Sequence, residues 1–312
     1  MIIRTTTESD LDRVLSALAR QSVNTTTPER YEEYLQLGIY RPGWTWLAED
    51  GDRLLGLAVW WGPSDADHPV ALDALWADPS VVDPSRVWAE LIRSMVDGLP
   101  ADAERPEYHV FLPGDWRGDL DIVAQLTPRR EAAAAAGLTV TTERLRYEWT
   151  PESAVPERSS RLTFVPEPDD EVFVDLFARV TEGSLDAGTA REVARGGAVG
   201  AARQELRVYR SMPGDRDWWR VAQDADGGLV GFAMPSANDG GPVVGYLGVL
   251  PEHRGHGYVD DLLAEITVIL AEGGAERIRA DTDLGNVPMA AAFERAGYVN
   301  FAIRLVSSLP GA

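Results

Sequence analysis

Apolar residues recur along the chain with two spacings, and the same order of spacings occurs twice. After the apolar pair at residues 2–3, the first amphipathic run places apolar side chains at Leu11, Val14, Leu15 and Leu18. After the pair at residues 164–165, the second run places them at Phe173, Leu176, Phe177 and Val180. The i, i+3, i+4, i+7 spacing predicts a short strand followed by an amphipathic helix in each half.

The later parts of the two halves also correspond. Residues 45–58 and 219–233 each alternate as a strand, an Asp/Gly turn and an apolar strand, which predicts two β-hairpins. Each half ends in a helical run followed by glycine, at residues 130–138 and 290–298. We therefore expect an α/β protein with two copies of one unit. The predicted boundaries are residues 1–150 for the first copy and 161–312 for the second, with a linker rich in Pro, Ser and charge at 151–160.

The most informative segment lies in the second copy, between Val243 and Leu270. An apolar strand ends at Pro251, a glycine-rich turn follows at residues 254–257, and an amphipathic helix comes next. The first N–H groups of a helix have no backbone partner, and the helix dipole is positive there. Glycines allow close approach and positive φ. The segment therefore predicts an anion site suited to phosphate.

The first copy departs from the second at this point. After Pro79 the chain continues Ser-Val-Val-Asp-Pro84, with no glycine and with prolines that remove N–H donors. We expect this copy to lack the anion-binding turn.

The glycine turn resembles the acyl-CoA-binding motif of the GNAT acetyltransferases, Gln/Arg-x-x-Gly-x-Gly/Ala. Arg254, Gly257 and Val259 take its fixed places, and Val259 departs from the family's small residue. Downstream, residues 277–282 are predicted as a strand, and Asn286 as the N-cap of an Ala-rich helix.

That helix is similar to the family's second signature, Asn-x-x-Ala-x-x-Leu-Tyr-x-x-x-Gly-Phe. Asn286, Gly297 and Tyr298 match it. The family's Tyr, often the general acid that protonates the CoA thiolate, falls on Phe293. Since Phe has no proton to give, the resemblance implies that this role is vacant or has moved.

The resemblance implies a tandem GNAT fold, an α+β arrangement in which each domain is a central mixed sheet flanked by helices. Acetyl-CoA would bind where the fourth and fifth strands of the second copy, 243–250 and 277–282, splay apart. The backbone of Gly248 and Val249 would bond the pantetheine, and Asn286 and Phe293 would line the same site. The pyrophosphate would lie on Arg254, Gly255, His256, Gly257, Tyr258 and Val259. Asp260 is unexpected there, because its carboxylate repels phosphate.

Direct transfer to an amine requires a base, since the ammonium must lose a proton. In the family the loop after the first helix lines the acceptor site, which favours Asp186 and Glu182. The alternative is an ordinary turn between helices. Asp281 and Asp283 are further candidates for the base, or else belong to a turn that leads into a helix. Tyr246 is a candidate for the displaced acid, with cross-strand packing as the alternative.

Composition limits the function further. The formal net charge of −21 argues against nucleic-acid binding and is compatible with a cationic amine acceptor, or simply with a solvated acidic surface. There are no cysteines, which excludes an acyl-cysteine relay, and the four histidines have no metal-ligand spacing, so no metal is expected. No apolar run suits a membrane span and the start does not resemble a signal peptide, so we expect a cytoplasmic protein with no membrane partner.

The resemblance thus implies an acyltransferase of the GNAT type that moves an acyl group, expected to be acetyl, from its CoA ester to a small-molecule amine by direct N-acyl transfer. A non-catalytic acyl-CoA-binding or regulatory module is the alternative. The chain is expected to be a monomer or homodimer.

Overall fold

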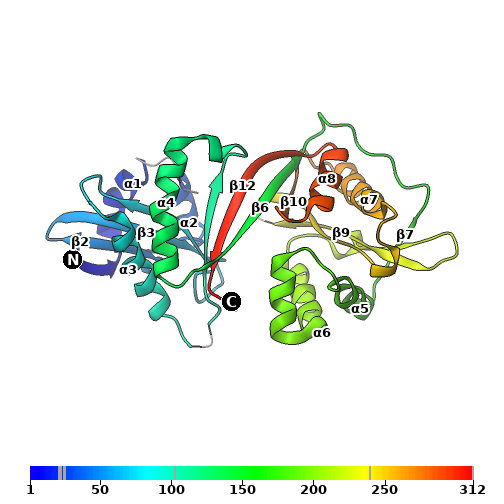
Figure 1. Ribbon diagram of the computed structural model, residues 1–312, viewed down its shortest axis with the longest axis horizontal. Coiled ribbons are helices and arrows are strands. Elements are labelled where there is room, and N and C mark those ends of the chain that lie inside the picture. The colour runs from blue at the N-terminus through cyan, green and yellow to red at the C-terminus, as the bar shows by residue number, and fades with distance from the viewer. Residues whose placement is uncertain (20–22, 24–25, 102, 239, 311–312) are drawn as a thin grey trace. The chain divides into compact units, whose positions relative to one another are not determined.

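The structure, a computed structural model, describes residues 1–19, 23, 26–101, 103–238 and 240–310. It divides into two compact units. Unit 1 holds residues 1–143 with the C-terminal segment from Ile303, and unit 2 holds residues 144–302. Each is a mixed sheet flanked by helices (Figure 1), as predicted.

Unit 1 has the strand order β1-β2-β3-β4-β5-β12, in which only β4 and β5 are parallel. Its strands are β1 (Ile2–Thr5), β2 (Thr45–Asp50), β3 (Arg53–Trp61), β4 (Ala71–Ala77), β5 (Glu107–Leu112) and the second part of β12 (Val299–Ser308). Its helices are α1 (Leu11–Leu18), α2 (Pro28–Gln36), α3 (Pro84–Asp97) and α4 (Leu120–Ala135), with the short 3-10 turns η1 (Glu8–Asp10), η2 (Pro42–Trp44) and η3 (Trp116–Gly118).

Unit 2 repeats this pattern in the order β7-β8-β9-β10-β11-β6, and only β10 and β11 are parallel. Its strands are β7 (Thr163–Pro166), β8 (Arg220–Gln223), β9 (Leu229–Asn238), β10 (Gly241–Val249), β11 (Ile278–Asp283) and most of β6 (Val140–Trp149). Its helices are α5 (Asp170–Val180), α6 (Ala187–Ser211), α7 (Tyr258–Glu272) and α8 (Val287–Arg295), with the turns η4 (Arg216–Trp218) and η5 (Pro251–His253).

The last strand of each half pairs in the other half's unit. Residues 144–149 of β6 pair with β11, and residues 303–307 of β12 pair with β5. The observed division therefore differs from the predicted boundaries at 150 and 161. Two copies of one fold offer equivalent sheet edges, so an exchanged strand finds the same kind of partner as its own. The linker at 151–160 contains no helix or strand and belongs to unit 2, where Arg158 pairs with Glu265 of α7 at 2.7 Å.

The repeated strand–helix and hairpin patterns are confirmed. The predicted amphipathic runs are α1 and α5, and the hairpins are β2–β3 and β8–β9. In unit 2 the side chains of successive sheet residues alternate between two cores. Helices α7 and α8 cover one face around Leu262, Ile266 and Phe293, and α5 and α6 cover the other around Phe177 and Ala202 (Figure 1).

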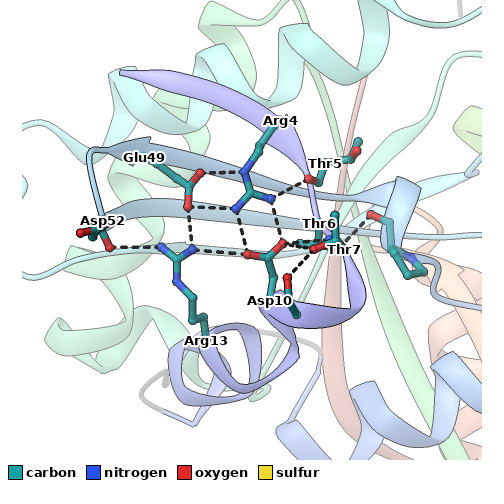
Figure 2. A network of polar contacts seen from close by, with 10 residues as sticks. Arg4, Thr5, Thr6, Thr7, Asp10, Arg13, Glu49 and Asp52 are labelled. Carbon is teal, nitrogen blue, oxygen red and sulfur yellow. Dashed lines mark hydrogen bonds and ion pairs between the residues drawn. The ribbon is translucent and has the colours of Figure 1, made fainter.

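A charged network fastens the first helix of unit 1 to its sheet (Figure 2). Arg4 of β1 donates to both carboxylate oxygens of Asp10 at 2.8 Å and to Glu49 of β2, also at 2.8 Å. Arg13 of α1 donates to Glu49 at 2.7 Å. The hydrogen bond from Arg4 holds the pKa of the buried Asp10 well below its usual range. Asp10 therefore stabilises the folded state while it is ionised.

We predict that Asp10→Asn lowers the free energy of unfolding at pH 7 by roughly 1–3 kcal/mol, because two buried charge-assisted bonds are lost. A depressed folded pKa contributes stability above the unfolded pKa, which is lost as pH falls. The difference from wild type should therefore narrow below about pH 4. Urea unfolding at several pH values measures this, with Asp12→Asn on the exposed side of α1 as the control. Equal losses in both variants would contradict the assignment.

Candidate active site

The parallel strands β10 and β11 meet and then diverge. They are paired at one register position, Val243 with Arg279. Beyond it, in the described part of the sheet, the edge of β10 that faces away from β9 has no strand partner. Residues Gly248 and Val249 lie on this stretch. Backbone groups of β10 that point away from β9 on this stretch can bond an extended ligand inserted between the strands.

A β-bulge turns β10 at the point of divergence. The register against β9 shifts between Val244 and Tyr246, at Gly245. A Cβ at Gly245 would lie 2.6 Å from the carbonyl oxygen of Met234, so only glycine fits. The Tyr209 hydroxyl of α6 donates to the Gly245 carbonyl at 2.7 Å. The bulge is thus held from the α5–α6 face of the sheet.

The glycine turn before α7 has the predicted backbone. Gly255 and Gly257 have φ of 81° and 73°, and Gly257 is the N-cap of α7. Arg161 donates to the carbonyls of His256 at 2.9 Å and Gly257 at 3.3 Å. Because C=O and N–H point in opposite directions across a trans peptide, the N–H groups of Gly257 and Tyr258 face away from Arg161.

These N–H groups are open to a ligand. Within the described residues, the backbone N–H groups of 255–259 donate to no protein acceptor, whereas those of Arg254 and Asp260 donate to Pro251 and Gly257. A run of unpaired donors at a helix N-terminus binds an anion. The predicted anion site therefore has the geometry that it requires.

The acidic residues in the first turn of α7 are both paired with arginine. Asp260 accepts from Arg295 of α8 at 2.6 Å, and Asp261 accepts from Arg161. Their charges are therefore partly neutralised. This accounts for the unexpected carboxylate of Asp260 beside a phosphate-binding turn.

The exposed Arg254 side chain lies against the C-terminal end of α5 rather than toward the turn. It donates to the carbonyls of Val249 at 3.2 Å, Glu182 at 2.5 Å and Val180 at 3.0 Å. A Cβ at Gly183 would lie 3.1 Å from its guanidinium, so Gly183 leaves room for it. Arg254 thus connects the C-terminal end of α5 to the glycine turn, and its cation suits the negative end of that helix.

The second signature has mainly structural contacts. Asn286 caps α8, since its side chain accepts the Met289 N–H at 3.4 Å, as predicted. Phe293 is buried and stacks on Tyr147 of β6, with ring centroids 5.0 Å apart. Tyr298 also packs against Phe293, at 5.3 Å, and is hydrogen-bonded to Thr267.

The two favoured base candidates lie in different settings. Asp186 is the N-cap of α6: it accepts the N–H of Thr189 at 2.7 Å and its hydroxyl at 3.1 Å. Arg144 lies 3.5 Å from the other oxygen of Asp186. Glu182 is exposed. Asp186 therefore caps a helix, which fits the alternative prediction that it belongs to an ordinary turn between helices.

The two aspartates at the end of β11 face arginines of β6. Asp281 pairs with Arg146 at 3.3 Å, and Asp283 with Arg144 at 3.4 Å. The buried Asp283 also accepts the N–H of Ala187 at 2.7 Å. These contacts tie the start of α6 to the end of β11, so both carboxylates have structural partners.

Tyr246 packs as the alternative prediction proposed. Its ring lies 5.1 Å from Phe177, 5.0 Å from Phe232 and 6.0 Å from Tyr209, against which it is stacked. Burial, with the negative charges of Glu205 and Asp186, raises the pKa of Tyr246 above its ordinary value. The phenol therefore keeps its proton at neutral pH.

A carboxylate that sequence reasoning missed is Glu205, on the inner side of α6. Burial, followed by the charges of Asp186 and Glu192, raises the pKa of Glu205 above its ordinary value, while the charge of Arg144 lowers it. The sequence did indicate an inward position for Glu205, because it lies one helical turn after Ala201 and one before Tyr209, and both of these pack inward.

In unit 1 the corresponding parallel strands also diverge, but a side chain lies between them. Strands β4 and β5 pair only at Ala71 and Leu72. The buried Arg129 of α4 then donates to the Leu75 carbonyl of β4 at 3.0 Å, and its guanidinium lies 4.8 Å from the Trp88 ring centroid. A side chain thus occupies the position that is open in unit 2.

Comparison with known proteins assigns the chain. Residues 198–298 match the family model described as the Acetyltransferase (GNAT) family. These residues of unit 2 carry the GNAT domain, and the comparisons support a GNAT N-acetyltransferase. A mycothiol acetyltransferase of Clavibacter michiganensis subsp. michiganensis (strain NCPPB 382) is 28% identical over 233 residues, which are 72% of this chain and 69% of that protein. The GNAT family uses acetyl-CoA as co-substrate.

Solved structures share the fold over both units. A GCN5-related N-acetyltransferase from Sphaerobacter thermophilus covers 100% of this chain and 96% of its own, with a TM-score of 0.58 and 17% identity. The glucosamine N-acetyltransferase region of a fungal multi-domain GH3 β-N-acetylglucosaminidase covers 98% of this chain and 38% of that chain, with a TM-score of 0.53 and 14% identity. At these identities the similarity concerns the tandem fold alone.

The described residues lack both a metal site and a membrane-spanning helix. They contain no group of three or more His, Cys, Asp or Glu side chains placed to hold a metal ion. None of their helices is long and apolar enough to cross a membrane.

We predict that Glu205→Gln raises the free energy of unfolding at pH 8 by about 1 kcal/mol, because an amide is easier to bury than a carboxylate. A raised folded pKa favours the folded state below the unfolded pKa, and that contribution is lost as pH rises through the folded pKa. The gain should therefore vanish near pH 4. Urea unfolding between pH 4 and pH 8 measures this gain in stability. The control is Glu171→Gln, at an exposed residue that pairs with Arg203. A destabilised Glu205→Gln at pH 8 would contradict the burial of the charge.

Proposed function

We propose that unit 2 transfers an acetyl group from acetyl-CoA directly to the amine of a small molecule. The observation that carries this proposal is the opening between β10 and β11 beside a turn whose N–H groups are unpaired. A hydrogen bond from the β10 backbone to the thioester carbonyl makes the carbonyl carbon more electrophilic. A pyrophosphate bound to the turn fixes the position of the thioester.

In this proposal the pantetheine lies along β10 and bonds the backbone of Gly248 and Val249. The pyrophosphate accepts hydrogen bonds from the N–H groups of the turn at 255–259. Asn286, the N-cap of α8, and Phe293 of α8 border the site. Arg254 acts indirectly, because its side chain holds the acceptor loop at Glu182 to the turn.

The acceptor is proposed to be a cationic amine. Several carboxylates lie near the start of α6, among them Asp186, Glu192 and Glu205. Arg144 lies 3.5 Å from Asp186, and Arg195 pairs with Glu192 at 3.0 Å. The field of the carboxylates favours a positively charged acceptor. The relative named mycothiol acetyltransferase supports a small-molecule acceptor. The family assignment favours catalysis over the non-catalytic acyl-CoA-binding alternative, although Phe293 occupies the place of the family's acid.

Asp186 and Glu182 as base, and Tyr246 as acid, stay predictions, as do a cytoplasmic location and a monomeric or homodimeric state. The general test is release of thiol from acetyl-CoA in the presence of an amine panel. Release that requires both the protein and an amine supports transfer. Tight acetyl-CoA binding without release under any amine would favour the binding module instead.

We predict one CoA site per chain, in unit 2. In unit 1 the divergence between β4 and β5 is occupied by Arg129, and no glycine turn precedes α3. Isothermal titration calorimetry of the full chain with CoA should give a stoichiometry near one. Two equal sites would show that unit 1 also binds the cofactor.

We predict that Gly257→Val abolishes CoA binding without unfolding the protein. A Cβ disfavours the φ of 73°, so the turn would change conformation and its N–H groups would no longer converge on the phosphate. Losing two charge-assisted contacts of roughly 1.5–3 kcal/mol each weakens binding on the order of 100-fold or more.

The matched control is Gly274→Val, since Gly274 follows α7, has φ of 86° and also has open space around a Cβ. Both variants carry a similar backbone strain, but only Gly257→Val should lose CoA in calorimetry. Normal binding by a folded Gly257→Val would refute the assignment of the turn.

A further inference from the structure

The segment just before β7 contacts the glycine turn from its carbonyl side. Arg161 donates to the His256 carbonyl at 2.9 Å and to the Gly257 carbonyl at 3.3 Å, and it forms an ion pair with Asp261 in the first turn of α7. Its guanidinium also lies 4.9 Å from the centroid of the Tyr258 ring. One guanidinium therefore bridges the glycine turn and the start of the helix that follows it.

The backbone around Arg161 is itself fixed. The Ser159 hydroxyl oxygen accepts the N–H groups of Arg161 and Leu162, both at 3.0 Å, and Leu162 is buried in the core beneath α7. Three residues before Arg161, Arg158 donates to both carboxylate oxygens of the buried Glu265 of α7, at 2.8 and 2.7 Å. The chain is thus fastened to unit 2 on both sides of Arg161, which gives the guanidinium a defined position.

The glycine turn is the kind of segment that gains from such a contact. Residues 254–257 are exposed, and Gly255 and Gly257 have the large conformational freedom of glycine. The Gly257 carbonyl also accepts the Asp260 N–H at 3.1 Å, whereas Arg161 is the donor that the described residues supply to the His256 carbonyl. Ordering a free loop around a ligand costs conformational entropy, and a loop that is already ordered avoids this cost.

Each carbonyl that Arg161 holds shares a peptide plane with an N–H group of the anion site. The His256 carbonyl lies in the plane of the Gly257 N–H, and the Gly257 carbonyl lies in the plane of the Tyr258 N–H. In the described part of the chain neither N–H donates to a protein acceptor. A cation on the carbonyl fixes the plane and also polarises the peptide group, which strengthens its N–H as a donor.

We infer that Arg161 is a positioning residue of the acyl-CoA site, which holds two peptide N–H groups in the orientation that the pyrophosphate requires. This inference rests on the proposed acetyl-CoA site in unit 2. Arg161 acts from the carbonyl side of the turn, without contact to the phosphates. The segment that joins the two halves of the sequence is in this way part of the site.

The test compares Arg161→Ala with a matched control, Arg295→Ala. Arg295 pairs with Asp260 at 2.6 Å, so its loss removes the same charge from the first turn of α7, but within the described residues it donates to no carbonyl of the glycine turn. In calorimetry of the full chain with CoA, Arg161→Ala should raise the Kd about 10-fold or more. Arg295→Ala should raise it less than about 5-fold. Arg161→Lys keeps the charge but not the planar fork, so it should also weaken binding.

Two further ligands separate positioning from other roles. 3′-Dephospho-CoA keeps the pyrophosphate, so Arg161→Ala should weaken its binding by the same factor as that of CoA. S-Acetylpantetheine lacks the pyrophosphate. Thiol release from it, with an amino sugar, a diamine and an amino acid as acceptors, should therefore proceed in Arg161→Ala at the wild-type rate. A merely structural role would slow transfer from both thioesters.

The inference is overturned if Arg161→Ala binds CoA as tightly as wild type, or if the two alanine variants lose the same affinity, which would assign the effect to charge alone. A loss confined to CoA and absent with 3′-dephospho-CoA would also overturn it, since Arg161 would then contact the 3′-phosphate directly. If wild type itself binds no CoA, the proposed function fails, and the role of Arg161 fails with it. If wild type and Arg161→Ala bind CoA equally, only the role of Arg161 fails.

Discussion

Most of the chemistry in this protein follows from a pair of parallel strands that separate after one paired position. Where β10 leaves β11, backbone N–H and C=O groups lose their sheet partners. Buried backbone groups that lack partners are costly, so such an edge must bond a side chain, water or a ligand. The two units meet this requirement differently. In unit 1 Arg129 donates to the Leu75 carbonyl within β4, whereas in unit 2 Arg254 donates to the carbonyl of Val249, the last residue of β10.

The exchange of the last strands gives unit 2 side chains from the first half of the sequence. Residues of β6 alternate between the two faces of the sheet. Tyr147 and Trp149 enter the core beneath α7 and α8, while Arg144 and Arg146 pair with carboxylates on the other face. The β6 strand therefore stacks Tyr147 on Phe293 and holds Asp283 at the end of β11. The last strand of the first half is in this way part of the unit that carries the proposed acetyl-CoA site.

Local patterns predicted much of the structure. The helix spacing at Leu11–Leu18, the hairpins, the positive φ of Gly257 and the cap at Asn286 all depend on neighbouring residues, and these predictions are confirmed. The exchanged strands were not predictable, because either sheet edge satisfies the same alternating pattern. Arg254 shows a second limit. The motif identified its position, but the direction of its guanidinium depends on carbonyls of Val180 and Glu182, about 70 residues earlier.

Glu205 was missed for a related reason. A glutamate at an inward position of a helix with many charged residues has no distinct pattern, and its environment comes from β6, β10 and the start of α6. The resemblance places the family's tyrosine at Phe293, which has no proton to give, so the choice between acid and base matters for the proposed reaction. A CoA thiol titrates near 8.5, so its thiolate leaves readily near neutral pH, whereas an alkyl ammonium titrates near 10 and holds its proton. Direct transfer therefore tolerates a missing acid better than a missing base. In the proposed reaction the stricter chemical requirement therefore falls on the proton acceptor.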